Sequence, residues 1–363
     1  MPSLGMLRET SGISGSAYPF MFSLAKSVHF LINHQLREYI PGLQKKSIDL
    51  ACNGVNLTNT FRPKNVDISA RPTVIVIHGM SPQGIEDVRI LRWCQSLAKL
   101  GYLVVAPEYK LLRDCGISIQ TAVDIQSTFE VIAADKDLCP SGKLAVMGVS
   151  FGASLSLIAA SRMDRPERFA AMCLVGGYYD LRDSLHYMIN NSSADPYGLT
   201  IFLKNFTHLL FDEPELAKEI LSISIEDLSY VREEPLAEKE ILRLCKLDQD
   251  RLGKYLSNQP FRAKWFQEIE DHLDELFNQH ALTDILGRVD FPITMIHGED
   301  DTVIPPSQSL QMYQELNRHS RRHHVLITPL ISHADASIGL KDSLHIQRMI
   351  FALGHFFRSA DRQ

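Results

Sequence analysis

The segment Gly148-Val149-Ser150-Phe151-Gly152 constrains the fold most strongly, because of the residues on either side of it. An apolar run, Lys143 to Met147, precedes it, and a run of small residues, Ala153 to Ala160, follows it. These flanks predict a strand, a sharp turn and a helix, with a serine at the apex of the turn. Both glycines suit this geometry, because a Cβ at position 148 or 152 would crowd the backbone or a neighbouring strand. A serine hydroxyl in such an exposed, strained position becomes a nucleophile when a base lies beside it.

The composition is that of an ordinary globular protein. The 363 residues are enough for one large domain or for a core with an inserted subdomain. Because the net charge is −6, a nucleic-acid-binding function, which needs a basic surface, is not expected. The six cysteines form no C-x-x-C pair, so we expect free thiols in a reducing compartment rather than disulfides or a zinc site.

Residues 1–40 are expected to form an N-terminal extension with an amphipathic helix over about 22–39. Its apolar residues recur at helical spacing: Phe22, Ala25, Val28, Ile32, Leu36 and Tyr39. The segment is too short and too polar to span a bilayer, and the start of the chain lacks the basic region of a signal peptide. We therefore expect a cytoplasmic protein whose N-terminal helix packs on its own domain. The alternative is that this helix docks on a membrane or a partner.

Strands and helices alternate through most of the remaining chain. Strands are expected at 73–77, 102–106, 143–148, 170–176, 291–297 and 324–328, with helices at 86–100, 119–135, from 150, 307–317 and 343–358. This α/β alternation predicts a mostly parallel sheet with helices on both faces. The pair Asn53-Gly54 predicts a type I′ hairpin within 47–62, which adds antiparallel strands at one edge.

Residues 181–287 interrupt this alternation. They contain no β-branched apolar run and are rich in Glu, Lys, Asp and Leu, so we expect an all-helical insertion. The α/β core is then expected in two parts, residues 41–180 and 288–363, separated by the insertion.

Residues with catalytic side chains follow four of the expected strands. Ser150 follows one directly, His78-Gly79-Met80 follows an earlier strand, Asp301 closes the loop after 291–297, and His333 follows the last strand. Because chemistry in open α/β sheets collects at the carboxyl ends of the strands, we expect these residues to converge.

On these residues the chain resembles the α/β hydrolase superfamily, over about residues 47–358. The order nucleophile, acid, histidine matches Ser150, Asp301 and His333. The family's H-G-x-x-D-x-x-(apolar)-P pattern begins at His297 and selects Asp301 as the acid, with Asp300 and Asp180 as alternatives. The other histidines near strands are expected to have structural or solvated positions: His78, His297, His323, His324, His345 and His355.

The resemblance implies an acyl-enzyme on Ser150, with His333 as general base and Asp301 orienting it. It also implies an oxyanion hole formed by the backbone N–H groups of Met80 and Phe151. The loop His-Gly-Met-Ser-Pro differs from the His-Gly-Gly-Gly of one lipase and esterase branch. No metal and no cofactor are expected, since the sequence has no H-E-x-x-H motif, P-loop or dinucleotide fingerprint.

The expected reaction is hydrolysis of a small-molecule carboxylic ester or thioester, with residues 181–287 forming a cap. We expect Tyr197, Phe261 and Trp265 to line a pocket for an apolar group; the alternative is that they form the cap's own small core. Three other functions remain open: an amide hydrolase like the aminopeptidases and prolyl peptidases, an acyltransferase, and a noncatalytic binding protein. The first would use an acidic residue of the cap, from Glu233-Glu234 or Glu268, Glu270 and Asp271. The sequence leaves the oligomeric state open.

Overall fold

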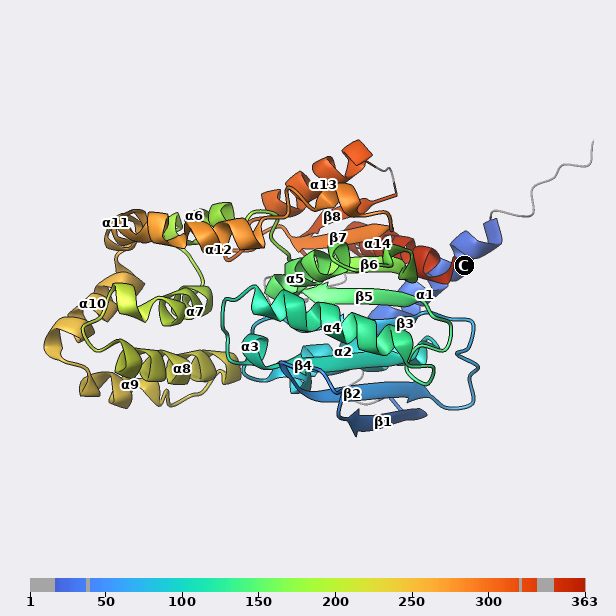
Figure 1. Ribbon diagram of the computed structural model, residues 1–363, viewed down its shortest axis with the longest axis horizontal. Coiled ribbons are helices and arrows are strands. Elements are labelled where there is room, and N and C mark those ends of the chain that lie inside the picture. Colours follow the sequence, from blue (N-terminus) through green and yellow to red (C-terminus); the bar gives the residue numbers. More distant parts are fainter. Residues whose placement is uncertain (1–16, 37–39, 320–321, 332–342, 363) are drawn as a thin grey trace, which may run out of the picture.

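The computed structural model describes residues 17–36, 40–319, 322–331 and 343–362. Within these residues, eight strands form one sheet in the order β1-β2-β4-β3-β5-β6-β7-β8 (Figure 1). The strands are β1 Leu43–Ile48, β2 Val55–Pro63, β3 Thr73–Ile77, β4 Val104–Tyr109, β5 Leu144–Val149, β6 Phe169–Val175, β7 Ile293–Gly298 and β8 His324–Thr328. Neighbours from β4 to β8 run parallel, whereas β1 and β2 are antiparallel. The mostly parallel sheet with an antiparallel edge is therefore confirmed.

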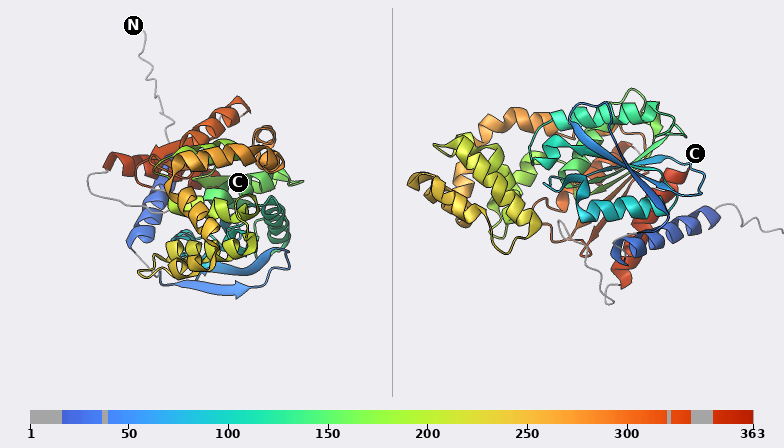
Figure 2. Two further views of the ribbon diagram at one scale, coloured as in Figure 1. Left: turned by 90° about the vertical axis from the view of Figure 1, so that its left-hand side faces the viewer. Right: turned by 90° about the horizontal axis from the view of Figure 1, so that it is seen from below.

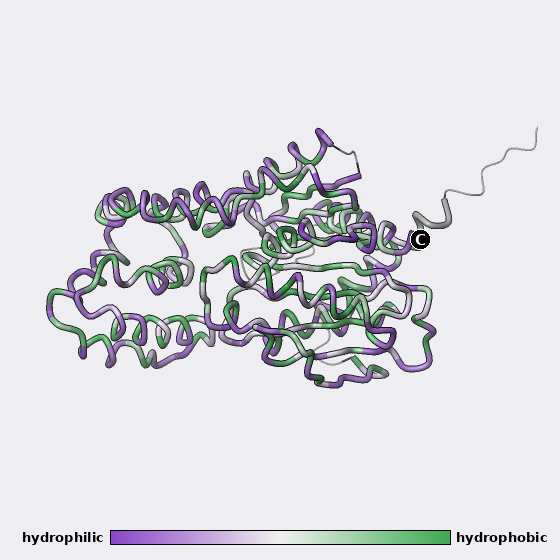
Figure 3. Tube along the Cα trace, viewed as in Figure 1, coloured by the Kyte–Doolittle hydropathy of each residue, from purple (hydrophilic) through white to green (hydrophobic). Residues whose placement is uncertain are grey.

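Helices cover both faces of this sheet, as Figure 2 shows. On one face lie α4 Gln120–Ala134, α5 Ser150–Ser161 and α13 Ser307–His319; on the other lie α1 Ala17–Leu36, α2 Val88–Lys99 and α14 Ser343–Asp361. Strand β3 has buried apolar side chains on both faces. Ile75 and Ile77 pack in the core under α4, α5 and α13, and Val74 and Val76 pack in the core under α1, α2 and α14. A strand with both faces buried needs a continuous apolar run, which is what its sequence provides. Figure 3 shows hydrophilic residues along the outer strand β1 and hydrophobic residues along the central strands.

The prediction of a tight hairpin at Asn53-Gly54 is wrong. Strands β1 and β2 pair Ile48 with Thr58, so a long loop rather than a two-residue turn connects the paired residues. Gly54 does have a positive φ of 73°, but its role is close packing. A Cβ there would lie 2.0 Å from Oδ2 of Asp124, and the Gly54 carbonyl accepts a hydrogen bond from the backbone N–H of Lys110 at 2.9 Å. The glycine lets the chain approach α4.

Helix α1 forms as expected but buries a different face. Ser23, Lys26, Ser27 and Phe30 are buried against α14 and α2, whereas Phe22, Val28 and Ile32 are exposed. The expectation that this helix packs on its own domain is therefore confirmed, but the buried face is not the one that carries most of the regularly spaced apolar residues. The tight fit of the two helices gives the reason. A Cβ on Gly354 of α14 would lie 3.0 Å from Cδ2 of Leu24 and 3.5 Å from Oγ of Ser27, so small residues are needed at this crossing. The expected Tyr39 lies outside the described residues.

Between β6 and β7 the described chain is helical, as expected for residues 181–287. The helices are α6 Leu181–Asn190, α7 Pro196–Asn205, α8 Pro214–Tyr230, α9 Ala237–Glu240, α10 Lys246–Ser257, α11 Gln259–Ile269 and α12 Asp274–His280. They lie beyond the carboxyl ends of the parallel strands, on the left of Figure 1. A short helix, α3 Lys110–Arg113, follows β4. None of the described helices combines the length and the hydropathy that a membrane span requires.

Candidate active site

Ser150 lies at the turn between β5 and α5, with a φ of 52° in the left-handed region. A non-glycine residue adopts this conformation only when its surroundings enforce it. The surroundings here are backbone: a Cβ on Gly152 would lie 2.2 Å from the carbonyl oxygen of His78, and one on Gly148 would lie 2.8 Å from Cα of Ala153. Gly152 therefore allows the loop after β3 to pack directly against the serine turn, and Gly148 allows the end of β5 to pack closely against α5.

The loop after β3 is held by His78. Its ring is buried, Nε2 accepts a hydrogen bond from the backbone N–H of Tyr109 at 3.1 Å, and Nδ1 lies 2.7 Å from the carbonyl oxygen of Gly79. Burial lowers the pKa of His78, and a neutral ring protonated on Nδ1 satisfies both contacts. Because His78 holds the Gly79 carbonyl, the N–H of Met80 in the same peptide group points away from the ring. A Cβ on Gly79 would lie 3.2 Å from Cβ of Ser150, so this peptide is next to the serine.

Asp301 follows β7 and is only 2% exposed. Its Oδ1 accepts hydrogen bonds from the backbone N–H groups of Val303 and Ile304, each at 2.9 Å. Its Oδ2 lies 3.4 Å from Nε2 of His297. A Cβ on Gly176, directly after β6, would lie 3.8 Å from the same oxygen, and β6 is the neighbour of β5, the strand that leads to Ser150. The loop therefore fixes the orientation of this carboxylate at the carboxyl edge of the sheet.

The two alternative acids have other positions. The Asp180 carboxylate caps α6 by accepting a hydrogen bond from the backbone N–H of Asp183 at 3.1 Å. Asp300 is exposed, next to the buried Asp301. Of the three candidates, Asp301 has the buried and oriented carboxylate that a triad needs.

His333, the expected base, lies outside the described residues, so its assignment stays a prediction. The structure does describe β8, whose Thr328 pairs with Gly298 of β7, three residues before Asp301. Several other histidines have structural partners. The ring of His297 contacts Oγ of Ser309 at 2.7 Å and the Ile304 carbonyl at 2.8 Å, and Nδ1 of His355 lies 2.7 Å from Oγ1 of Thr294.

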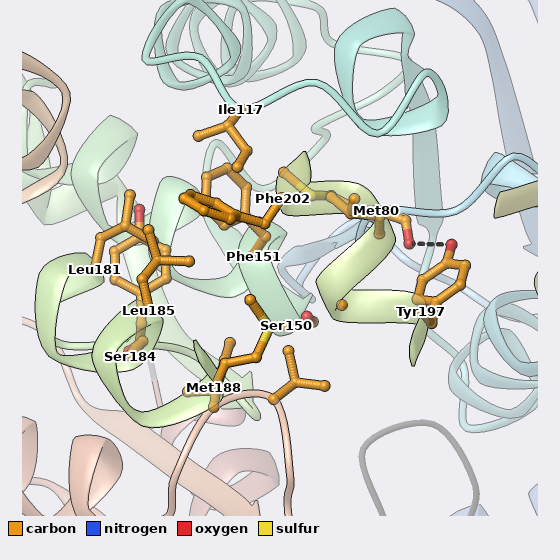
Figure 4. A pocket seen from close by; sticks show the side chains of 15 residues that line it. Met80, Ile117, Ser150, Phe151, Leu181, Ser184, Leu185, Met188, Tyr197 and Phe202 are labelled. Carbon is orange, nitrogen blue, oxygen red and sulfur yellow. Dashed lines mark hydrogen bonds between the residues drawn. The ribbon is translucent and has the colours of Figure 1, made fainter. Parts of the chain in front are cut away.

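A pocket of about 80 Å³ opens above Ser150, between the core and the cap (Figure 4). Its walls are apolar side chains from both parts: Met80, Ile117, Phe151, Leu181, Leu185, Met188, Ile201, Phe202, Val303 and Ile304. Ser150, Tyr178, Ser184, Tyr197 and Gly198 complete it. Among these described lining residues, no side chain carries a charge. The pocket therefore fits an apolar group placed beside the serine hydroxyl.

Tyr197, expected to line the pocket, also joins the cap to the loop after β3. Its hydroxyl donates a hydrogen bond to the Met80 carbonyl at 3.1 Å, drawn as a dashed line in Figure 4. The hydroxyl is also 3.8 Å from Sγ of Cys115, and burial raises the pKa of Tyr197 above its usual range, so it remains a donor. Helix α7 thereby restrains the residue whose N–H is the expected oxyanion donor.

The other two expected pocket residues are elsewhere. Trp265 is buried in the cap, where its Nε1 donates to the Leu209 carbonyl at 3.2 Å and its ring packs edge-on against Tyr255. Phe261 is half-buried and is not among the residues that line the pocket. The first part of the cap lines the pocket instead. The spacing of Leu181, Leu185 and Met188 on one face of α6 is the signal that could have identified it.

One cluster of potential metal ligands occurs among the described residues, at Glu213, Cys245 and Asp248. Asp248 accepts hydrogen bonds from the backbone N–H groups of Asp212 and Glu213 and pairs with Arg251 at 2.9 Å. Glu213 accepts one from the N–H of Cys245 at 3.0 Å. These carboxylates connect α8 to α10 of the cap, and we assign no metal to them.

Comparison with solved structures finds similar chains at low identity. Brefeldin A esterase, a bacterial homologue of human hormone-sensitive lipase, aligns with a TM-score of 0.51 and 13% identity, over 94% of this chain and 87% of that one. An esterase from Pyrococcus furiosus gives 0.46 and 14%, over 88% and 93%. The acylaminoacyl peptidase of Pyrococcus horikoshii gives 0.45 and 16%, over 88% of this chain. The chain spans 41% of the length of that peptidase.

Comparison with curated protein sequences finds no match. The family described as "alpha/beta hydrolase fold" matches residues 72–328, a range that contains Ser150, Asp301 and the cap helices. The matched range, the sheet order and the turn at Ser150 agree, and this chain belongs to the α/β hydrolase family.

Proposed function

We propose that this protein is a serine hydrolase that cleaves a carboxylic ester or thioester with an apolar acyl group. The observation that carries the proposal is the position of Ser150. It has a left-handed backbone, lies against the Gly79-Met80 peptide, and forms part of an apolar pocket. A strained, pre-positioned hydroxyl of this kind is the arrangement that acyl transfer to serine requires.

In the proposed reaction, His333 takes the proton of Ser150 while Oγ attacks the substrate carbonyl carbon. The N–H groups of Met80 and Phe151 stabilise the oxyanion that forms, and Asp301 stabilises the histidinium. When the tetrahedral intermediate collapses, His333 gives the proton to the leaving alcohol or thiol. Water then attacks the acyl-enzyme with His333 again as base, which releases the acid and restores the serine.

The lining of the pocket favours an ester over an amino-terminal peptide as substrate. An aminopeptidase needs a carboxylate to bind the substrate's ammonium group. The expected candidates in the cap do not line the pocket. Glu270 pairs with Arg182 and with the ring of His186, each at 2.9 Å, and Glu234 is exposed.

The test is the rate of hydrolysis of nitrophenyl esters of increasing acyl length, compared with aminoacyl nitroanilides. We expect kcat/KM to rise from acetate to medium-length acyl chains, because each added methylene buries apolar surface in the pocket. Ser150→Ala should abolish the activity and Ser184→Ala, another serine of the pocket, should keep it. Faster cleavage of anilides with a free amino group would contradict the esterase proposal and assign the protein as a peptidase.

A further inference from the structure

The exposed face of α1 is apolar except for His29. What we call the α1 stripe consists of Met21, Ala25, Val28 and Ile32, at spacings of three or four positions, together with Phe22 beside Met21. The exposed fractions are 69% for Met21, 58% for Phe22, 38% for Val28 and 43% for Ile32. The other face packs on α14 and buries Ser23, Lys26 and Ser27. Since a contiguous exposed apolar face is unusual for a helix packed on a globular core, it indicates an interaction surface.

A hollow of about 260 Å³ adjoins the stripe, and Phe22 belongs to both. We call it the arginine hollow; its lining residues are Phe22, Lys26, Ala70, Arg71, Pro72, Arg358, Asp361 and Arg362. Four of these side chains are basic and one is acidic. They come from α1, from the segment before β3 and from the end of α14, so the fold brings together charges that are far apart in the sequence.

The single carboxylate of the hollow is already bonded within the protein. Oδ2 of Asp361 pairs with Nζ of Lys26 at 2.5 Å, and Oδ1 accepts a hydrogen bond from the Tyr102 hydroxyl at 2.8 Å. Burial lowers the pKa of Lys26, and the nearby charge of Arg71 acts in the same direction. Since the one carboxylate among these lining residues already pairs with Lys26, basic side chains outnumber acidic ones in the hollow of a chain whose net charge is −6.

Arg71 is held in position to serve such a site. Its Nη1 donates a hydrogen bond to the Leu100 carbonyl at 2.6 Å, and its guanidinium lies over the Tyr102 ring with Cζ 5.8 Å from the centroid. Guanidinium groups bind phosphate oxygens through paired N–H donors, and a fixed guanidinium loses little entropy when it does so. The chemistry of the hollow therefore suits a phosphate group.

We propose that the α1 stripe and the arginine hollow together dock on a bilayer that contains anionic phospholipids. A headgroup phosphate enters the hollow while Phe22, Val28 and Ile32 enter the interfacial region, the combination by which amphipathic helices bind membranes. Figures 1 and 2 place α1 and α14 at the end of the core away from the cap, so docking leaves the cap side free. The proposal does not depend on the proposed hydrolase activity.

The basic side chains of the hollow favour an anionic bilayer over the other possible occupants of this surface. In a two-fold contact between copies of this chain, the same arginines would approach one another and repel. Residues 1–16 contain a single carboxylate, Glu9, next to Arg8, which offers little to complement three guanidinium groups. An anionic membrane complements both the charge of the hollow and the apolar character of the stripe.

The test is flotation of the full chain with vesicles of phosphatidylcholine alone or mixed with phosphatidylglycerol. We expect binding to the mixed vesicles only, weakening as salt is raised. Val28→Asp and the double variant Arg358→Gln/Arg362→Gln should each reduce partitioning about ten-fold or more. Matched controls are Leu247→Asp, an exposed leucine of α10, and Arg318→Gln, an exposed arginine of α13; both should bind like the wild type.

Equal binding to both kinds of vesicle, binding to neither, or equal loss in the control variants would overturn the proposal. Stabilisation by inorganic phosphate without vesicle binding would assign the hollow to a soluble anion instead. Self-association that Val28→Asp abolishes, again without vesicle binding, would assign the stripe to a second copy. Melting curves check that each variant folds, and labelling of Ser150 by a fluorophosphonate should be the same in all of them.

Discussion

At the scale of single residues, the site depends on three glycines beside the Ser150 turn, at positions where a side chain would not fit. Gly79, Gly148 and Gly152 each lie where a Cβ would meet backbone or the serine within 3.2 Å. The φ of 52° at Ser150 is maintained because these contacts leave the chain no relaxed alternative. The position of the nucleophile is therefore determined by packing of the backbone.

Gly152→Ala should disrupt this packing. The added methyl would lie 2.2 Å from the His78 carbonyl, so either α5 or the loop after β3 must move. We expect a loss of about 2 kcal/mol in the free energy of unfolding, measured by urea titration, and a large fall in kcat. Gly253→Ala in α10 is the control. A Cβ there meets nothing within 4 Å, so alanine should stabilise the helix by about 0.5–1 kcal/mol. Similar behaviour of the two variants would contradict this explanation.

The sequence predicted the placement of Ser150, Asp301 and Met80 well, because each follows a strand with a strong apolar pattern. It was less successful for the pocket. Aromatic character alone selected Trp265, yet only the packing of the cap decides that this ring faces Tyr255 rather than Ser150. Long-range packing of this kind has no local signature in the sequence.

At the scale of elements, α7 connects the cap to the expected oxyanion hole. Its Tyr197 hydroxyl restrains the Met80 carbonyl at 3.1 Å. The position of this cap helix and the position of the Met80 peptide are thus coupled through one hydrogen bond.

Tyr197→Phe tests this coupling. Loss of a hydrogen bond worth about 1 kcal/mol should lower kcat about five-fold with little change in KM, because the restraint acts on transition-state binding. The control is Tyr255→Phe, which removes a comparable hydrogen bond, to the Leu199 carbonyl at 3.1 Å, inside the cap. It should lower the melting temperature and leave kcat unchanged. An equal effect of the two variants on kcat would show that Tyr197 supports only the stability of the cap.

Helix α1 illustrates the limit of hydropathy at this scale. The spacing of apolar residues correctly indicated a helix but selected the wrong face for burial. Gly354 and Asp361 of α14, more than 300 residues away, determine the packing of α1 through a close crossing and the ion pair with Lys26. Neither partner can be identified from the helix's own sequence.

At the scale of the whole molecule, the order of the elements was predictable because parallel strands and helices alternate with strong patterns. The loop between β1 and β2 was not, because Gly54 serves the packing against Asp124 rather than a tight turn. Local turn signals are ambiguous where a glycine is also needed for a close approach.

Buried and half-buried histidines should make the stability of the whole chain depend on pH. Burial lowers the pKa of His34, His323 and His355 to about 4 each, from 6.5. Between these values the unfolded chain takes up protons that the folded chain does not, so stability falls as pH drops from about 6.5 to about 4.

His34→Phe should reduce this dependence. The phenyl ring keeps the stacking on Phe30, whose centroid lies 6.1 Å away, and removes one proton-binding group. Between pH 7 and pH 5, the variant should lose about 1 kcal/mol less unfolding free energy than the wild type, measured by urea titration at each pH. Parallel pH dependences of the two proteins would show that His34 binds protons equally in both states.

The most direct test of the central claim is the intact mass of the protein after treatment with a fluorophosphonate. An activated serine displaces fluoride and retains the phosphonyl group, so we expect one adduct on the wild type and on Ser184→Ala, and none on a folded Ser150→Ala variant. Absence of an adduct on the folded wild type, or its persistence in Ser150→Ala, would contradict the assignment of Ser150 as the nucleophile.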